Sequence, residues 1–444
     1  MNTPLCDFVR SYAESAPLRL HMPGHKGDTI LGAEPLDITE IPGADSLFEA
    51  TGILAKSEKN ASKLFGAHTF YSAEGSSLSL RAMLFLACLS AKEQGKRPVI
   101  AAGRNAHKTF LSAAALLDFE IRWLTARGPS YLTCPVTPET LEEDLNRMPN
   151  VTAVYVTSPD YLGNTLDLEG ISALCKKRNL LFLCDNAHGA YLKFLSPSRH
   201  PMDLGADLCC DSAHKTLPVL TGGAYLHLNK TLPESLIGQA RSALALFAST
   251  SPSYLILQSL DAANRICADT FPNHLSTAVR SVEILKQDLL RQGFSLLGDE
   301  PLKLTVTAKT YGYTGTELSE YLATQGIVCE FADPDAVVMM FSPTQAEFAC
   351  RKLQASLSRL KRKPPIRTAP PAPSDHRQAC SVREAMLSPS EELPVDRCIG
   401  RILASPSVGC PPAVPIAVCG EELTEADTEA FRYYGIRTCR VVKK

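Results

Sequence analysis

Lys215 and Asp185 have the side-chain types and the sequence settings that catalysis with an organic cofactor needs. Lys215 closes a polar turn, 211–215, that directly follows the apolar run 206–210. Asp185 directly follows a second apolar run, 180–184. A lysine that can form an imine, and an acid that can keep a pyridine nitrogen protonated, are the two groups that pyridoxal phosphate (PLP) chemistry requires. The two residues together predict a PLP enzyme.

Simpler interpretations exist for each of these residues. A lone lysine after a strand is usually solvated, and a lone acid there usually caps the following turn. We favour catalysis because both residues follow strand-like runs, and a parallel sheet brings the ends of its strands to one edge. His188 follows Asp185 by three residues and could contact the cofactor or the substrate. Taken alone, it would more often be a packed histidine.

Gly75, Ser76 and Ser77 have the composition of a phosphate site. They precede a helical pattern at 78–84, and backbone N–H groups at a helix start bind phosphate well. Glycine lets the phosphate approach closely, although a serine that only caps the helix is the alternative. Further donors could come from Ser212 and His214.

His107 ends another run and precedes a helical pattern at 109–117. A flat imidazole there could stack on the pyridine ring and hold it perpendicular to the bonds that break. A capping or solvent-facing histidine fits the sequence equally well.

Composition narrows the class of protein. The formal net charge of -2 provides no long-range field for nucleic acid or an anionic membrane. The N-terminal segment lacks the apolar stretch of a signal peptide, and no run reaches the roughly 20 apolar residues of a membrane span. The 15 cysteines include no C-x-x-C pair, and many lie in apolar runs. We expect a soluble cytoplasmic protein with reduced cysteines and no metal site, which acts on a small molecule.

The pattern along the chain predicts an α/β fold. Short apolar runs alternate with helix-like segments between 67 and 230, which is typical of a parallel sheet flanked by helices. Polar clusters follow five of six such runs, so they can converge at one edge of the sheet. The six runs are 68–71, 98–102, 153–157, 180–184, 206–210 and 224–228.

Five consecutive parts are expected along the chain. An N-terminal arm is followed by a large PLP-binding domain, a small α+β domain, a stiff proline-rich linker and a C-terminal piece. Their residues are 1–50, 51–295, 296–362, 363–375 and 376–444, respectively.

Taken together, the motifs of the chain resemble those of the Orn/Lys/Arg decarboxylase family. The resemblance is to its shorter bacterial members, which lack an N-terminal wing domain, and it covers nearly the whole chain. The C-terminal piece then corresponds to a decarboxylase-type subdomain. The motifs are His-Met-Pro-Gly-His-Lys at 21–26, Gly-Ser-Ser at 75–77, Arg-Asn-Ala-His-Lys at 104–108, Asp-Asn-Ala-His-Gly at 185–189, Ser-Ala-His-Lys at 212–215 and Pro-Pro-Ala-Val-Pro at 411–415.

This resemblance implies PLP-dependent fold type I, with a seven-stranded, mostly parallel sheet and a smaller C-terminal region. It also implies a homodimer or higher homo-oligomer with active sites at the subunit interface. Lys215 would form the imine with PLP, Asp185 would pair with the pyridine nitrogen, and His107 would stack on the ring. The residues around the phosphate would be Gly75, Ser76, Ser77, Ser212 and His214.

The implied reaction is α-decarboxylation of arginine, lysine or ornithine to an amine of polyamine metabolism. An aminotransferase would use the same lysine and aspartate. A PLP-binding protein without turnover is a second alternative, against which the intact lysine, aspartate and phosphate residues argue. The chain departs from many relatives at Asn186, where they have glutamate, and at Gly222, where they have glutamine. Asp45 and Glu421 are two acids that could face the cationic end of the substrate, by their place in family-like segments.

Overall fold

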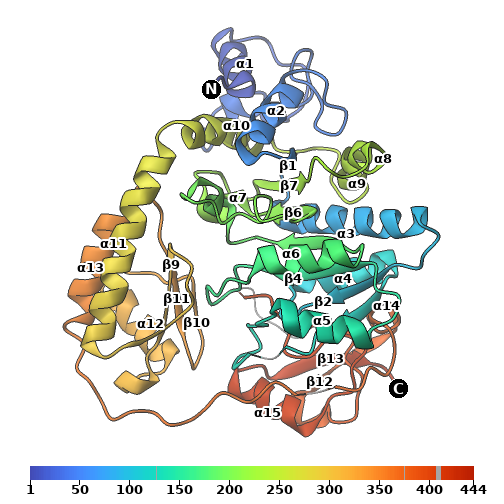
Figure 1. The fold of residues 1–444 in the computed structure, drawn as a ribbon. Helices are drawn as coiled ribbons and strands as arrows, with labels where there is room; N and C mark the ends of the chain where they lie inside the picture. Colours follow the sequence, from blue (N-terminus) through green and yellow to red (C-terminus); the bar gives the residue numbers. More distant parts are fainter. Residues whose placement is uncertain (127, 375, 407–411) are drawn as a thin grey trace. The chain divides into compact units, whose positions relative to one another are not determined.

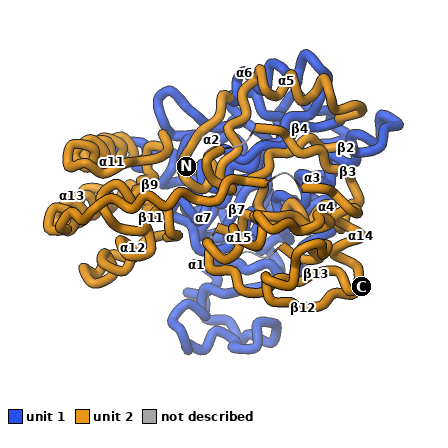
Figure 2. The backbone as a smooth tube through the Cα atoms, turned by 90° about the horizontal axis from the view of Figure 1, so that it is seen from below, with its two compact units in different colours: residues 1–98, 152–158, 168–273 blue, residues 99–151, 159–167, 274–444 orange. Residues whose placement is uncertain are grey.

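The computed structural model of this chain describes all residues except 127, 375 and 407–411. Pro411 of the C-terminal motif and position 375 of the expected linker therefore lie outside the described residues. The chain forms two compact units, drawn in two colours in Figure 2. The first comprises 1–98, 152–158 and 168–273, and the second comprises 99–151, 159–167 and 274–444. The five consecutive parts expected from the sequence stay a prediction.

The first unit combines strands of the large sheet with helices that cover them (Figure 1). Helix α3 packs on β6 and β7, and α6 packs on β5. Its strands are β1 (His68–Ser72), β4 (Ala153–Thr157), β5 (Leu181–Asp185), β6 (Leu208–Asp211) and β7 (Ala224–Leu228). Its α-helices are α1 (Pro4–Glu14), α2 (Ile53–Phe65), α3 (Gly75–Glu93), α6 (Leu168–Lys177), α7 (Ala213–Thr216), α8 (Glu234–Gly238), α9 (Ala240–Ala245) and α10 (Tyr254–Ala268).

The large sheet has seven strands in the order β1-β7-β6-β5-β4-β2-β3. Strands β4, β5 and β6 run parallel to one another, and so do β2 (Val99–Ala102) and β3 (Glu120–Trp123). Strand β7 is antiparallel to both of its neighbours. The residues of β4 to β7 are almost all buried, so these strands are apolar runs without an exposed face.

The second unit adds two smaller sheets, of four strands and of two (Figure 1). The four-stranded sheet contains β8 (Ser295–Leu297), β9 (Lys303–Thr307), β10 (Phe331–Ala332) and β11 (Val337–Met340), and the two-stranded sheet pairs β12 (Ser390–Pro394) with β13 (Thr438–Val442). Its helices are α4 (Lys108–Leu117), α5 (Pro138–Arg147), α11 (Phe271–Gln292, which begins in the first unit), α12 (Gly315–Thr324), α13 (Ala346–Leu357), α14 (Val382–Leu387) and α15 (Glu425–Tyr433).

The strands predicted from apolar runs all occur, within two residues of the expected bounds. The sequence pattern missed β3, because Glu120 and Arg122 break its apolar character, and β8, which is only three residues long. It also did not indicate helix α1 in the N-terminal arm. No helix in the described ranges has the length and apolar character needed to cross a bilayer. The described cysteines are free thiols, as expected, and most are buried.

Phe182, the second residue of β5, should anchor the core beneath the strand that ends in Asp185. Its side chain is fully buried, whereas Phe348 on α13 is 66% exposed. We expect Phe182→Ala to lower the free energy of unfolding by about 3–5 kcal/mol, because it leaves a cavity in a packed core. The same substitution at Phe348 should change it by less than about 0.5 kcal/mol. Urea unfolding of both variants measures the difference, and equal effects would contradict the described core.

Candidate active site

The polar residues predicted to act on the cofactor meet at the carboxyl ends of two neighbouring strands. Strand β5 ends in Asp185, and in the parallel pairing Asp185 lies beside Cys210 of β6. The chain after β6 turns at Ser212 into the short helix α7, which carries Lys215. The strand pairing therefore sets the separation of the acid and the lysine before any side chain is considered.

Asp185 is a buried carboxylate with three donors around it. Its Oδ2 accepts from the Tyr155 hydroxyl at 2.9 Å, and its Oδ1 accepts from the Ala187 backbone N–H at 3.2 Å. The Cys210 thiol lies 3.6 Å from Oδ1. Burial raises the pKa of the Asp185 carboxyl, and these donors together with the Lys215 charge oppose that rise.

Lys215 faces His188. The lysine Nζ lies 3.1 Å from His188 Nε2, and the backbone N–H of Lys215 donates to the Ser212 carbonyl. His188 is only 5% exposed and Lys215 is half-buried, so the lysine amine meets a buried imidazole. An imidazole nitrogen at this distance can accept a proton from the ammonium group, which leaves a nucleophilic amine.

The two segments predicted to hold a phosphate also come together. Ser212 Oγ donates to Ser76 Oγ at 2.6 Å, and the Gly75 N–H donates to the Gly222 carbonyl at 2.7 Å. Gly222 has a φ of +100° and lies against the Ala73 carbonyl, so glutamine would not fit this backbone without a shift. The departure from the family pattern at Gly222 thus has a local backbone reason.

His214 is arranged differently from the expectation that it donates to a phosphate. Its backbone N–H and its Nδ1 both face the Gly223 carbonyl, at 3.1 and 3.0 Å. Burial and the neighbouring Lys215 lower the pKa of His214. The neutral ring that donates through Nδ1 has only an acceptor left at Nε2.

These residues fit PLP as a group. A Cβ built on Gly75 would meet nothing within 4 Å, so there is open space at the start of α3. The side chain of Glu74, which precedes α3, makes no capping hydrogen bond within the described structure. A phosphate would find helix N–H groups and serine hydroxyls here, while the buried Asp185 carboxylate matches a ring cation.

His107, the residue predicted to stack on the pyridine ring, makes its described contacts at the start of α4. It belongs to the second unit, where its Nδ1 accepts from the Thr109 backbone N–H at 3.1 Å and caps α4. The capping interpretation of the sequence is therefore realised. Stacking of this ring on a cofactor stays a prediction.

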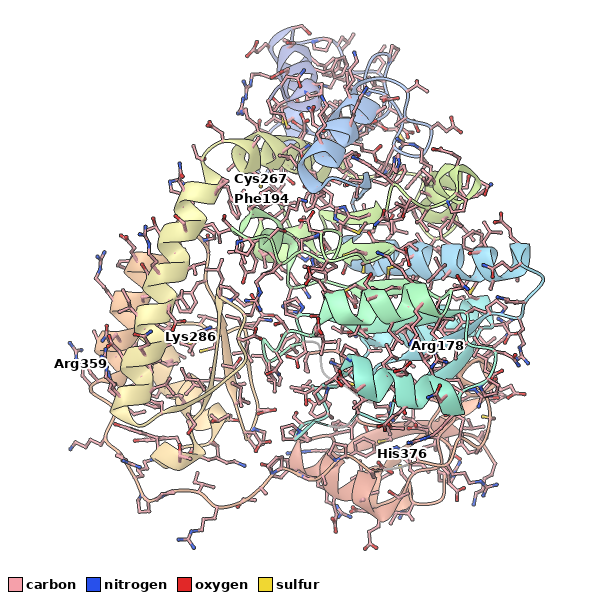
Figure 3. All side chains as sticks on the ribbon, in the orientation of Figure 1. Arg178, Phe194, Cys267, Lys286, Arg359 and His376 are labelled. Carbon is pink, nitrogen blue, oxygen red and sulfur yellow. The ribbon has the colours of Figure 1, made fainter. Side chains whose placement is uncertain are left out.

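Asp45 and Glu421, the two acids considered for the substrate side chain, both have other partners. The Asp45 carboxylate accepts several backbone N–H groups at the start of α2, including those of Gly52 and Leu54 at 2.7 and 3.0 Å. Glu421 binds Arg104 Nη2 through both oxygens, at 3.0 and 2.7 Å. His376, labelled in Figure 3, lies 3.5 Å from the same carboxylate.

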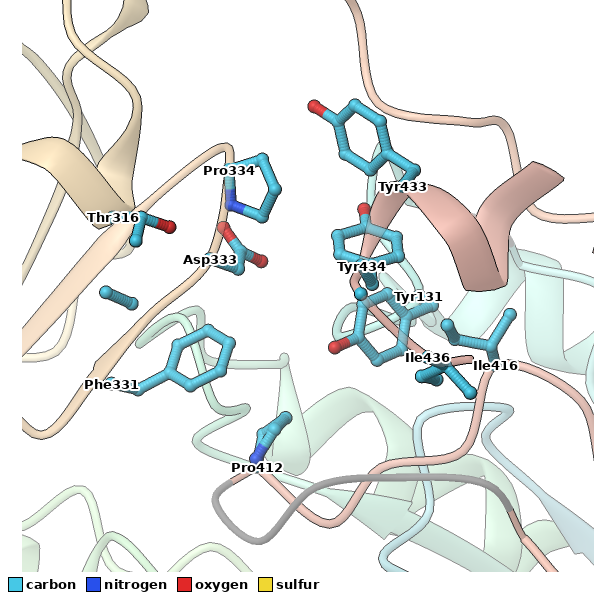
Figure 4. Close-up of a pocket in the computed structure, with 12 residues that line it drawn as sticks. Tyr131, Thr316, Phe331, Asp333, Pro334, Pro412, Ile416, Tyr433, Tyr434 and Ile436 are labelled. Carbon is cyan, nitrogen blue, oxygen red and sulfur yellow. The ribbon is translucent and has the colours of Figure 1, made fainter. Parts of the chain in front are cut away.

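A separate pocket of about 300 Å³ lies within the second unit (Figure 4). Asp333 in its wall accepts from the backbone N–H groups of Asp335 and Ala336, and burial raises the pKa of this carboxyl to about 6. None of the residues predicted to bind the cofactor lines the pocket. Its labelled lining residues are Tyr131, Thr316, Phe331, Asp333, Pro334, Pro412, Ile416, Tyr433, Tyr434 and Ile436.

Tyr155 and Cys210 contact Asp185, and the sequence pattern did not indicate either of them. The structure shows that both are fully buried. In the sequence, both lie inside apolar runs and look the same as ordinary core positions. The one usable signal is the strand period of two. Tyr155 is opposite Leu183 in the pairing of β4 with β5, and Leu183 is two residues from Asp185 on the same face.

Known structures share this fold. The lysine decarboxylase LdcF of Francisella novicida superposes with a TM-score of 0.80 at 15% identity, covering 99% of this chain and 81% of that one. The constitutive lysine decarboxylase of E. coli gives 0.78 at 17% identity, covering 100% and 82%. A NifS-like protein gives 0.55 at 15% identity, covering 81% of this chain and 97% of that one. The fold defines the class: fold type I of the PLP-dependent enzymes.

Sequence comparison then identifies the family. Residues 3–296 match the family model described as Orn/Lys/Arg decarboxylase, major domain, and the chain belongs to the Orn/Lys/Arg decarboxylase family. It is 29% identical to the uncharacterized protein YaaO of Bacillus subtilis (strain 168), covering 97% of this chain and 93% of that protein. It is 26% identical to an arginine decarboxylase of the same organism, covering 95% and 91%. The predicted fold class and family are confirmed, and the chain is a decarboxylase of the PLP-dependent type.

Asp185 and Asp211, the last residue of β6, should give opposite pH effects on the stability of the cofactor-free protein. Burial raises the folded-state pKa of Asp185. For Asp211, electrostatic attraction to His200 and His227, together with their hydrogen bonds, outweighs burial and lowers the pKa. Above the ordinary value of about 3.9, Asp185 therefore costs stability and Asp211 adds it. At pH 7, Asp185→Asn should raise the unfolding midpoint by about 1–3 °C and Asp211→Asn should lower it similarly.

Near pH 3 both differences should shrink, because the Asp185 penalty is absent below the unfolded-state pKa and the Asp211 contribution fades as that carboxyl approaches its folded-state pKa. Thermal unfolding of the cofactor-free variants across pH 3–8 gives the comparison. Effects of the same sign at pH 7 would show that the two carboxylates do not differ as described.

Proposed function

We propose that this protein catalyses PLP-dependent α-decarboxylation of a basic amino acid, which is arginine, lysine or ornithine, to the corresponding amine and carbon dioxide. The observation that carries the proposal is the cluster at the ends of β5 and β6. There the Lys215 amine lies 3.1 Å from His188, and the buried Asp185 shares the same turn as that histidine. The membership of the chain in the decarboxylase family supports the reaction type.

The residues of the chain divide the work between them. Bound PLP would supply an electron sink for the bond that breaks at the substrate Cα. Asp185, kept in place by Tyr155, would hold a proton on the ring nitrogen, and Lys215 would be the attachment residue. His188 would exchange a proton with the Lys215 Nζ at 3.1 Å. His107 would orient the ring.

The phosphate would be held by the start of α3 and by hydroxyls from two segments, which the bond between Ser212 and Ser76 already joins. Gly75 leaves the space for it, and Ser77 adds a second hydroxyl on the first turn of the helix. His214 would contribute by fixing the turn at Gly223, and it could donate through Nε2 only in the protonated form.

Arginine is the first substrate to test. Several curated relatives that match at least 94% of this chain are named arginine decarboxylase, at 26–27% identity. The amine product would enter polyamine metabolism. By analogy with the family, we further propose a cytoplasmic homodimer or higher homo-oligomer with active sites at the subunit interface.

The direct test incubates the purified protein and PLP separately with arginine, lysine and ornithine, and identifies the amine formed. We expect carbon dioxide and agmatine, cadaverine or putrescine, without any keto acid. An aminotransferase would require a keto acid and release no carbon dioxide. A protein that takes up PLP yet turns over none of the three amino acids would contradict the proposed function.

Lys215→Ala should lower kcat by at least about 1,000-fold, because attachment of the cofactor and exchange of the proton are both lost. Lys230→Ala, a change at an exposed lysine of the same unit, is the matched control and should keep kcat within about twofold. Steady-state release of carbon dioxide measures both. A Lys215→Ala variant with wild-type kcat would rule out the assigned role.

A further inference from the structure

Asp211, the last residue of β6, is the centre of a fully buried polar cluster in the first unit. Its Oδ1 accepts from Asn186 Nδ2 at 2.7 Å, and its Oδ2 accepts from His200 Nε2 at 3.0 Å and His227 Nε2 at 3.1 Å. The Cys209 thiol lies 3.6 Å from Oδ1. None of these residues takes part in the proposed reaction, so a buried carboxylate with this many donors needs another explanation.

Hydrogen bonds on the far side of each imidazole show where the protons lie. His200 Nδ1 accepts from the Met202 backbone N–H at 3.3 Å, so its Nε2 carries the hydrogen that Asp211 accepts. His227 Nδ1 lies 2.9 Å from the Thr69 hydroxyl, which can donate to it. Each ring can then donate through Nε2 to Asp211, which is the carboxylate at the centre of the cluster.

This pattern favours a hydrogen-bond network over a metal centre, although His200, Cys209 and Asp211 have ligand atoms within 4.8 Å of one another. A metal ion would need the lone pair of His200 Nε2. The ring proton would then have to move to Nδ1, where it would oppose the Met202 N–H. Phe65 covers both imidazoles, with ring centroids 5.3 and 4.5 Å away, and keeps the cluster apolar on that side.

Asn186 connects this cluster to the catalytic turn. Its backbone N–H donates to the Cys210 carbonyl at 3.0 Å, and its side-chain amide donates to Asp211 on the same strand. The backbone carbonyl of Asn186 accepts from the Gly189 backbone N–H at 2.8 Å, and this bond closes the turn. Asp185 comes directly before Asn186, and His188 comes two residues after it.

We propose that Asn186 and Asp211 are positioning residues, a matched pair of one amide and one carboxylate that holds Asp185 and His188 at their distances from Lys215. This inference rests on the proposed function for its kinetic consequence. The pair joins the end of β5, which carries the acid and the histidine, to the end of β6, which leads to the lysine. The Asn186–Asp211 pair can hold the two strand ends together because only Asp211 carries a charge, and Asn186 donates a hydrogen bond to it.

Exchanging the two groups is the sharpest test. Asn186→Asp alone would set two buried carboxylates 2.7 Å apart and drive the turn away from β6. In the double variant with Asp211→Asn, the new amide can accept from both histidines with its oxygen and donate to position 186 with its nitrogen. The double variant thus restores the hydrogen bonds, with the negative charge at position 186 and not at position 211.

The experiment compares four cofactor-loaded proteins: wild type, Asn186→Asp, Asp211→Asn and the double variant. We expect Asn186→Asp to lower kcat at least tenfold with KM changed less than threefold, and to alter the cofactor absorption spectrum. The double variant should return kcat to within threefold of wild type and restore the spectrum. A double variant that folds but is no better than Asn186→Asp, or an Asn186→Asp variant with wild-type kcat and spectrum, would overturn the proposal.

Asn164→Asp is the matched control. Asn164 Nδ2 donates to Asp160 Oδ2 at the same distance of 2.7 Å, but this pair belongs to the second unit. The control should lose thermal stability and keep the wild-type spectrum and kcat. An equal loss of kcat in Asn164→Asp would mean that general destabilisation explains the effect, and it would overturn the proposal.

Failure of the Asn186→Asp variant to fold and failure of the proposed function have different consequences for the proposed pair. If Asn186→Asp does not fold, Asn186→Leu removes the hydrogen bond without adding a charge, and wild-type kcat and spectrum in that variant would overturn the proposal. If the wild-type protein decarboxylates none of the three amino acids, the proposed function fails. The spectra of the four loaded proteins then still decide whether the pair positions Lys215 and Asp185.

Discussion

The structure depends on keeping a carboxylate charged in a place where water cannot solvate it. Asp185 is 3% exposed at the end of a strand that is apolar on both faces, and burial alone would favour its neutral form. Donors from β4, from the following turn and from β6 oppose this penalty. The sheet therefore positions the Asp185 carboxylate and also supplies hydrogen-bond donors that oppose the cost of burying its charge.

The same edge of the sheet contains a second buried carboxylate with the opposite balance. Asp211 is surrounded by donors that lower the pKa of its carboxyl, whereas Asp185 has fewer donors and burial raises the pKa of its carboxyl. Asn186 directly follows Asp185 in the chain, and its side-chain amide donates to Asp211. Asp185 and Asp211, at the ends of neighbouring strands, thus have pKa values shifted in opposite directions because their hydrogen-bond partners differ.

Much of the fold and part of the site could be predicted from the sequence. The clustering of Lys215, Asp185, Ser212 and Ser76 could be predicted because each follows an apolar run or opens a helix, and parallel pairing brings such positions together. Tyr155 and Asp211 were not found, because a tyrosine in an apolar run and an acid at the start of a polar turn have ordinary structural explanations. Their roles depend on partners that are distant in sequence, such as His227 for Asp211.

Lys215 is the residue to which we assign attachment of the cofactor, and the proposed roles of Asp185 and His188 depend on it. The most direct measurement is to load the protein with PLP, reduce it with borohydride and locate the pyridoxyl group by peptide mapping. The account predicts the label on Lys215 in the wild type, and no label at that peptide in Lys215→Ala. A label on another lysine, or no label in a protein that has bound PLP, would contradict it.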